Sequence, residues 1–411
     1  MAERSQKNEM PRINPAIMEW ARETAGLSRE DVVTKLTIRP TKKATAVERL
    51  RALEHGETEP TRTMIAKMAK VYRRPLLTFY LSQPPARGNR GQDFRTLPAD
   101  YSVVDDALVD ALIREVRVRQ SIVLEALVSE EEAVEHAFVG SIRMRDGMAA
   151  ALNRLQDVLS MGRAQYRAEA TIEEAFRVLR EHAERAGVFV ILQGDLGSHH
   201  SSIAVETFRG FALADRIAPF IVINDHDSPT AWSFTLLHEL VHIFLGETGV
   251  SGARAESELE RFCDETASAF LLSDQELAAL RIDNQTDIVV AQREIGEFAR
   301  PRKLSHAMVA YRLLRVGAIS HAYWRPLHAA FRQFWLNSQA QRRQRTRQQE
   351  GGPNYYVVRR HRIGDALIDF TRRMLGSGAL TTVKAAKVLA IKPQNVGTLL
   401  SGANADAGRA A

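Results

Sequence analysis

The sequence predicts a mainly helical protein with one small β-sheet, an α+β fold, and three observations support this prediction. Apolar residues recur with helical period along most of the chain. Residues 188–224 change to short β-branched and aromatic runs, and the helical period returns directly after Pro229. Because domains hold roughly 100 to 200 residues, a chain of 411 residues should fold as two or three domains.

The composition is that of an ordinary folded protein. Hydrophobic residues make up 45% and charged residues 26% of the chain, which excludes disordered, collagen-like and low-complexity classes. No apolar run approaches the roughly 20 residues of a membrane helix, and residues 1–20 lack the apolar core of a signal peptide. We expect a cytoplasmic protein without a membrane partner. Lys and Arg (56) exceed Asp and Glu (50), which permits a polyanionic partner without requiring one.

The segment 14–80 has the pattern of a compact domain of four or five short helices. The first helix starts with a proline suited to a first turn and ends at Gly26, and Ser28 is the expected N-cap of the second. The third helix ends at Gly56, and the fourth covers residues 61–72.

The middle of the chain predicts the elements of a larger domain. Two long amphipathic helices, in residues 105–127 and 171–187, precede about three short strands. The helix in residues 230–246 has apolar side chains almost all round, so we expect it to be buried. A second helix follows in residues 256–273.

A domain boundary belongs at residues 84–98, which are rich in Pro, Gly and charge. Residues 381–402 near the end form two short helical patterns joined by a turn, as in a helix-turn-helix, although such pairs are common. The expected divisions are an N-terminal helical domain, a linker, a central domain and a helical C-terminal region: residues 1–83, 84–100, 101–315 and 316–411.

The strongest chemical signal is the run His238-Glu239-Leu240-Val241-His242 in the apolar helix. Cys263 is the only cysteine, which excludes a disulfide framework and a cysteine-rich zinc finger, so histidines and carboxylates would have to bind a metal. Residues four apart share one face of a helix, so both imidazoles can reach one zinc ion. Glu239 would lie beside that face, where its carboxylate can take a proton from water that the metal makes acidic. Although such a run can arise by chance, a metal explains three polar residues in an apolar helix, where unpaired polar groups are costly to bury.

A catalytic zinc with an open position has three protein ligands, so one more is needed. We expect Glu260 on the following helix to be that ligand. Asp264, one turn further, would form a hydrogen bond with a ligating histidine. Glu256, Glu258 and Glu265 are the alternatives.

A catalytic zinc site also needs groups that hold and polarise its substrate, which could be a peptide. An extended edge strand can bind a peptide by strand addition, and residues 208–215 or 218–224 are candidates. Several side chains could stabilise an oxyanion or orient a substrate. For each of them taken singly, an ordinary role as an exposed loop residue or a packed side chain is the more common one. The candidates are His199, His200, His226, Asp215 and Tyr311.

The strands, the HExxH helix and the acidic helix occur in an order that resembles a known family. The runs FRGFALADRIAPFIVIN, FTLLHELVHIFLG and ERFCDETASAFLL look like the ImmA/IrrE family of zinc metallo-endopeptidases, over about residues 170–315. The resemblance implies a zincin-like core that cleaves a DNA-binding repressor, in a stress response or in mobile-element induction. It assigns His238 and His242 as Zn²⁺ ligands and Glu239 as the base. Asp264 stands where relatives often have Asn, and Ser273 where many have Pro.

The N-terminal helices resemble the Cro/C1-type helix-turn-helix domains. The runs ARETAGLSREDVVTKL and ALEHGETEPTRTMIAKMAKVY match the first two helices and the segment after the recognition helix. The run TIRPTKKATAVERL between them is longer than the usual turn. The resemblance implies DNA binding, and a homodimer would fit two half-sites.

A recognition helix within residues 41–53 would present side chains to bases and phosphates. Glu48 and Glu54 would repel phosphate if they faced it, and the alternative is a helical domain that docks proteins. The residues expected to contact DNA are Lys42, Lys43, Thr45, Arg49 and Arg51.

Together these expectations describe a zinc-dependent endopeptidase fused to a DNA-binding domain, with a protein substrate and DNA as its partners. The alternative is a transcriptional regulator in which the zinc fold is a sensor or scaffold without proteolytic activity.

Overall fold

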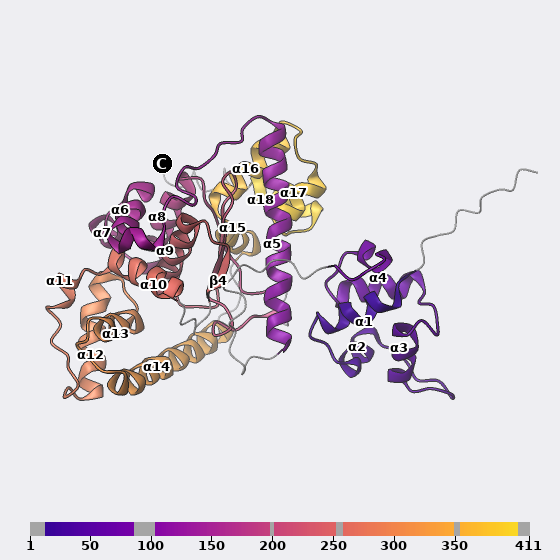
Figure 1. Ribbon diagram of the computed structural model, residues 1–411, viewed down its shortest axis with the longest axis horizontal. Helices are drawn as coiled ribbons and strands as arrows, with labels where there is room; N and C mark the ends of the chain where they lie inside the picture. The colour runs from indigo at the N-terminus through magenta and orange to yellow at the C-terminus, as the bar shows by residue number, and fades with distance from the viewer. Residues whose placement is uncertain (1–12, 86–102, 198–200, 252–257, 349–353, 402–411) are drawn as a thin grey trace, which may run out of the picture. The chain divides into compact units, whose positions relative to one another are not determined.

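The computed structural model describes residues 13–85, 103–197, 201–251, 258–348 and 354–401. These residues form two compact units (Figure 1). The first contains residues 13–85, 103–114, 196–197 and 201–203, and the second contains the described residues of 115–195 and 204–401. The predicted fold class is confirmed, because the described residues are mainly helical and their one small sheet lies in the second unit. None of the described helices is both long and apolar enough to cross a membrane.

The first unit is a bundle of short helices, as predicted. A Ser, Thr or Asn side chain caps the N-terminus of each α-helix. The apolar faces meet in one core that includes Ile17, Leu50 and Ile65. The elements are α1 (Pro15–Glu23), α2 (Arg29–Leu36), α3 (Ala46–Glu54), α4 (Arg62–Val71) and the 3-10 helix η1 (Leu76–Tyr80).

A buried ion-pair network connects the first three helices of this unit. The carboxylate of Glu54, at the end of α3, accepts hydrogen bonds from Arg22 Nε at 2.6 Å and from Arg29 Nε at 2.8 Å. Glu54 is buried, so it does not face a phosphate. Glu48 is engaged as well, because its carboxylate accepts a hydrogen bond from the backbone N–H of Thr45 at 2.7 Å in a capping box.

The sheet of the second unit has four strands in the order β1-β3-β2-β4. The three predicted strands are present, and a fourth strand of three residues follows the HExxH helix. β1 pairs with β3 in parallel, whereas β2 runs antiparallel to both β3 and β4. The strands are β1 (Phe189–Leu192), β2 (Gly210–Leu213), β3 (Phe220–Ile223) and β4 (Gly249–Ser251).

The strand order corrects one expectation from the sequence. Residues 208–215 and 218–224 contain β2 and β3, which lie inside the sheet with a strand paired on each side. Neither has a backbone edge left for an added peptide strand, so the prediction that one of them binds substrate in this way is wrong. The edge strands of the sheet are β1 and β4.

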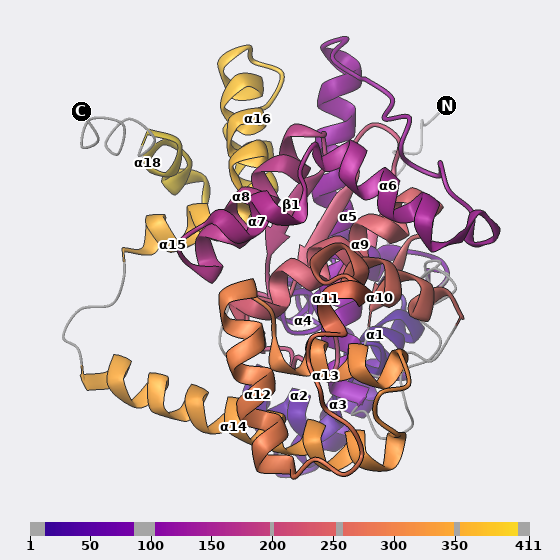
Figure 2. The same cartoon turned by 90° about the vertical axis from the view of Figure 1, so that its left-hand side faces the viewer.

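The predicted buried helix, α9 (Pro229–Leu245), lies at the centre of the second unit. It packs against β2 and β3, and it also contacts α8 (Ile172–Arg185) and α10 (Glu258–Leu271). Further along the chain, α14 packs against α12 and α13 (Figure 2). The other helices before residue 349 are α5 (Val103–Ser129), α6 (Gly147–Leu159), α7 (Arg163–Ala168), α11 (Asp274–Leu277), α12 (Ile288–Ala299), α13 (His306–Arg315) and α14 (His321–Gln348).

The C-terminal helices join the core of the second unit through β1 and α8. Arg180 Nη1 on α8 donates a hydrogen bond to the carbonyl of His361 at 2.5 Å, and Glu184 Oε2 accepts one from the backbone of Ala366 at 3.1 Å. Gly364 lies between these two bonds with a φ of 90°. The C-terminal helices are α15 (Tyr355–Ile363), α16 (Asp365–Gly376), α17 (Thr382–Val388) and α18 (Val396–Ser401).

Candidate metal centre

Helix α9 carries the HExxH run into the core. It begins with Pro229 in its first turn and ends at Gly246, whose φ of 74° is the left-handed conformation of a helix C-cap. Strands β2 and β3 pack on one side of α9, and other helices pack on its remaining sides. This packing explains why the surface of α9 is apolar. His238, Glu239 and His242 are 3%, 0% and 0% exposed.

Three donor groups face one another at this point. His238 Nε2 lies 3.0 Å from His242 Nε2. The two carboxylate oxygens of Glu260 on α10 lie 3.2 Å from His238 Nε2 and 3.1 Å from His242 Nε2. Ligand atoms about 2.1 Å from a tetrahedral zinc are about 3.4 Å from one another. The donor set and its spacing therefore fit one zinc ion, with Glu260 as the third protein donor.

The electrostatics of the cluster favour a positive charge between these groups. Burial disfavours a protonated His238, but the carboxylates of Glu260 and Asp264 outweigh this effect and raise the pKa of His238 well above its usual value. Burial also opposes the charged form of Glu260, yet His238 and His242 lower the pKa of Glu260 far below its usual range. Buried carboxylates and imidazoles of this kind are stabilised by a shared cation.

Asp264 is placed as expected for a residue that orients a ligand. Its Oδ1 lies 2.9 Å from His238 Nδ1, which leaves Nε2 of that ring for a metal. Asp264 thus makes the contact with His238 although ImmA/IrrE proteins often have Asn at this position. Ser273, the other departure, caps α11, where its Oγ accepts a hydrogen bond from the backbone of Glu276 at 3.4 Å.

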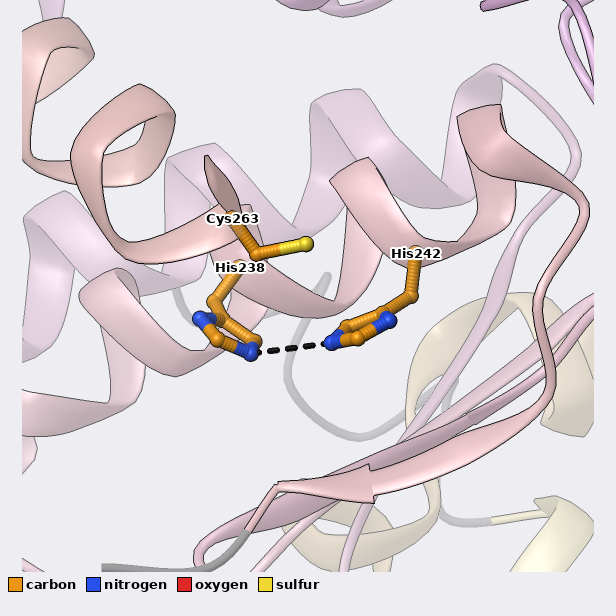
Figure 3. Close-up of side chains that lie close together, drawn as sticks. All are labelled: His238, His242 and Cys263. Atoms are coloured by element: carbon orange, nitrogen blue, oxygen red, sulfur yellow. Dashed lines mark hydrogen bonds between the residues drawn. The ribbon is translucent and has the colours of Figure 1, made fainter. Parts of the chain in front are cut away.

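Cys263 also belongs to this cluster, and the sequence reasoning missed it. It follows Glu260 by three positions on α10, so the two residues share one face of the helix. Its Sγ and one ring nitrogen each of His238 and His242 lie within 4.8 Å of one another, and all three residues are buried (Figure 3). The centre therefore offers a thiol beside the carboxylate as a further donor. The spacing of three residues between Glu260 and Cys263 was the feature of the sequence that could have placed Cys263 at the cluster.

Glu239, the expected base, lies against strand β2. A Cβ atom built on Gly210 would be 2.8 Å from Glu239 Oε1 and 2.6 Å from Cγ2 of Thr235. Only a residue without a side chain lets β2 approach α9 this closely. Gly210 is thus a second site residue that the sequence reasoning missed, because its role depends on a contact between separate elements.

The alternative third ligands do not share this position. Glu256 lies outside the described residues. Glu258 is exposed at the start of α10, and Glu265 pairs with Arg315 instead. Glu260 is the acidic residue of α10 that the structure brings to both histidines.

Among the expected substrate-orienting residues, one lies near the cluster. Burial and the Asp264 carboxylate raise the pKa of Tyr311 on α13 to about 12, which keeps its hydroxyl protonated. Asp215 Oδ1 accepts backbone hydrogen bonds in the turn before β3, and His226 lies beside Asp225 in the loop before α9. His199 and His200 fall outside the described residues.

In the first unit, the expected DNA contacts fall into two groups. Thr45 caps α3, and Arg49 Nη1 donates a hydrogen bond to the carbonyl of Arg39 at 2.5 Å, so both hold the connection between α2 and α3. Lys42 and Lys43 lie in that connection and Arg51 lies on α3; all three are exposed. DNA contact by these residues stays a prediction.

The comparison with protein families matches residues 183–314 to the IrrE N-terminal-like domain. This region contains β1 to β4, both helices of the metal cluster and all but the last residue of α13. The expected resemblance is confirmed for this part of the chain, whereas the relation of residues 1–83 to helix-turn-helix domains stays a prediction. No curated protein and no solved structure matches the chain.

Proposed function

We propose that the chain is a zinc-dependent endopeptidase. The observation that carries this proposal is the group formed by His238, His242 and Glu260, whose donor atoms lie 3.0, 3.1 and 3.2 Å apart in the core of an IrrE N-terminal-like domain. In this proposal the two histidines and Glu260 are the ligands, and Asp264 orients His238.

When bound, zinc supplies a Lewis acid that polarises a peptide carbonyl and lowers the pKa of water. Glu239, adjacent in sequence to a ligand, is the proposed general base. Its carboxylate takes a proton from the attacking water and returns it to the nitrogen of the cleaved peptide bond. Asp264 keeps the His238 ring in one orientation through its Nδ1. Tyr311 is available as a hydrogen-bond donor near Asp264.

We further propose a regulatory setting for this activity. The resemblance to ImmA/IrrE proteins favours a DNA-binding repressor as the substrate, in a stress response or in mobile-element induction. DNA binding by the first unit is supported by exposed Lys42, Lys43 and Arg51, and by the engagement of Glu48 and Glu54 within the fold. A homodimer would present two such units to two half-sites.

A second candidate function rests on Cys263. If its thiolate were a fourth ligand, the zinc would be closed to water, as in structural sites, and the domain would act as a sensor or scaffold. The buried sulfur within 4.8 Å of the histidine nitrogens is the observation that favours this alternative.

A comparison of the wild-type protein with Glu239→Gln tests the endopeptidase proposal. Both proteins are incubated with candidate repressors, and their zinc content is measured by mass spectrometry. We expect equal zinc in both and cleavage only by the wild type, because the substitution removes the base and leaves the ligands in place. Cleavage at the same rate by both proteins would contradict the role of Glu239. Zinc binding without cleavage of any candidate by either would favour the sensor.

A further inference from the structure

Residues 355–401 carry a positive charge that equals the excess of the whole chain. They contain eight Lys and Arg residues and two Asp residues, an excess of six, and the full sequence of 411 residues has a formal net charge of +6. The rest of the chain is therefore balanced. A cationic segment on an otherwise balanced chain indicates a polyanionic partner if its cations reach the surface.

Some of these cations hold the fold of the segment. Arg359 Nη2 donates hydrogen bonds to the carbonyls of Leu389 and Ala390 at 2.7 and 2.9 Å, directly after α17. Arg360 Nη1 donates to the carbonyl of Leu399 in α18 at 3.0 Å. Two arginines of α15 thus bind the backbone directly after α17 and within α18.

Other cations are exposed on α17 and on the turn that follows it. Lys384, Lys387 and Lys392 are all exposed. Lys384 pairs with Glu125 of α5 at 3.2 Å, whereas Lys387 and Lys392 form no ion pair within the described part of the chain. Arg117 of α5 lines an open hollow together with Lys384 and Lys387. Arg117, Lys384 and Lys387 thus line one hollow, which Glu125 also lines, and Lys392 is exposed on the turn after α17.

The two helices follow one another as a helix, a turn and a second helix. The turn contains Ala390 with a φ of 47° and the 3-10 helix η6 (Pro393–Asn395). Apolar residues of both helices are buried, and α17 packs on α16. Gln394, Thr398 and Ser401 are exposed at or on the second helix, and the described part of α18 exposes no large apolar side chain. Exposed amides and hydroxyls at or on α18 suit base edges and phosphates. The exposed apolar side chains near the lysines, Val383 of α17 and Val118 of α5, lie outside α18.

We propose that α17 and α18 form a nucleic-acid interface that binds double-stranded DNA, separate from the N-terminal helices and from the metal centre. Lys387 and Lys392 contact phosphates, with Lys384 and Arg117 beside them, and α18 faces the groove. This interface does not depend on peptidase activity. It gives the chain a second DNA contact, at the opposite end of the sequence from residues 1–83.

The test is the salt dependence of duplex binding by the full chain, measured by fluorescence anisotropy with a DNA duplex of mixed sequence. The variant combines Lys387→Glu with Lys392→Glu. The matched control combines Arg281→Glu with Arg293→Glu, which changes the net charge equally at exposed positions in and before α12 (Figure 1). A milder variant, Lys387→Gln with Lys392→Gln, is measured in parallel in case charge reversal disturbs folding, which melting by circular dichroism reports.

Two lost phosphate contacts should lower the affinity on the order of tenfold and reduce the slope of log K against log salt by about 0.9 per contact. The Gln variant should show a smaller loss of the same kind, and the control should bind as the wild type. The proposal is overturned if the Lys variants bind like the control. It is also overturned if only Lys42, Lys43 and Arg51 substitutions weaken binding, or if an RNA or an acidic protein binds and the duplex does not.

Discussion

At the scale of single residues, the central question is which side chain completes the metal centre. Glu260 and Cys263 lie on the same face of α10, and both are buried beside His238 and His242. Carboxylate and thiolate ligands give different chemistry, because a site of two histidines and a carboxylate keeps a position for water, whereas an added thiolate closes it. The spacing of 3.1 and 3.2 Å from the Glu260 oxygens to the two Nε2 atoms favours the carboxylate.

Cobalt substitution distinguishes the two ligands. We expect Co²⁺-loaded protein to show no sulfur-to-cobalt charge-transfer absorption, and we expect Cys263→Ala to keep its metal while Glu260→Ala loses most of it. Cys263 is the only cysteine, so any thiolate band must come from it. A charge-transfer band in the wild type that vanishes in Cys263→Ala would show a thiolate ligand and support the sensor.

At the scale of elements, the approach of β2 to α9 positions Glu239. Gly210→Ala would place a Cβ 2.6 Å from Thr235 Cγ2, 2.8 Å from Glu239 Oε1 and 3.1 Å from the carbonyl of Val222. We expect a loss of about 1–3 kcal/mol in unfolding free energy from overpacking, and slower cleavage because Glu239 is displaced, with zinc content retained. Denaturant unfolding and a cleavage assay measure the two effects.

Gly376→Ala is the matched control for this substitution, since nothing lies within 4 Å of a Cβ at that position of α16. It should leave both stability and cleavage near the wild-type values. Equal behaviour of the two variants would show that the contact between β2 and α9 does not constrain the site.

The elements also show what sequence reasoning can reach. α9 was predictable because its apolar pattern, the proline in its first turn and the glycine at its end are local signals. His238 and His242 followed from their helical spacing, whereas Glu260 and Asp264 were preferred on the next helix with Glu256, Glu258 and Glu265 left as alternatives. β4 has three residues and no pattern of its own, so neither it nor the internal position of β2 and β3 could be inferred. The close approach at Gly210 arises only when segments distant in sequence pack together.

At the scale of the whole molecule, the C-terminal helices are part of the structure that holds the metal centre. Arg362 Nη2 lies 2.6 Å from Asp225 Oδ2, in the loop between β3 and α9. The buried pair of Arg180 and Glu184 on α8 bonds the backbone on both sides of Gly364. These contacts predict one cooperative unfolding unit that includes α8, β1, α15 and α16. Helices α15 and α16 belong to it although they follow residue 314, the last residue matched by the IrrE N-terminal-like domain.

The substitution Gly364→Ala tests this cooperativity. Its Cβ would lie 2.3 Å from both Arg180 Nη2 and Glu184 Oε1, and the φ of 90° adds backbone strain. Gly378→Ala is the control, because its φ of 83° also disfavours a side chain while nothing lies within 4 Å of its Cβ. Left-handed strain alone should cost about 1–2 kcal/mol. The loss in Gly364→Ala should be larger, because its ψ of 152° is a conformation that glycine alone adopts readily and its Cβ also meets the ion pair and the carbonyl of Val190. By hydrogen exchange, we expect Gly364→Ala to reduce protection in α8 and β1 as much as in α15 and α16, because one cooperative unit opens as a whole. Loss of protection confined to α15–α18 would instead make the C-terminal helices a separate folding unit.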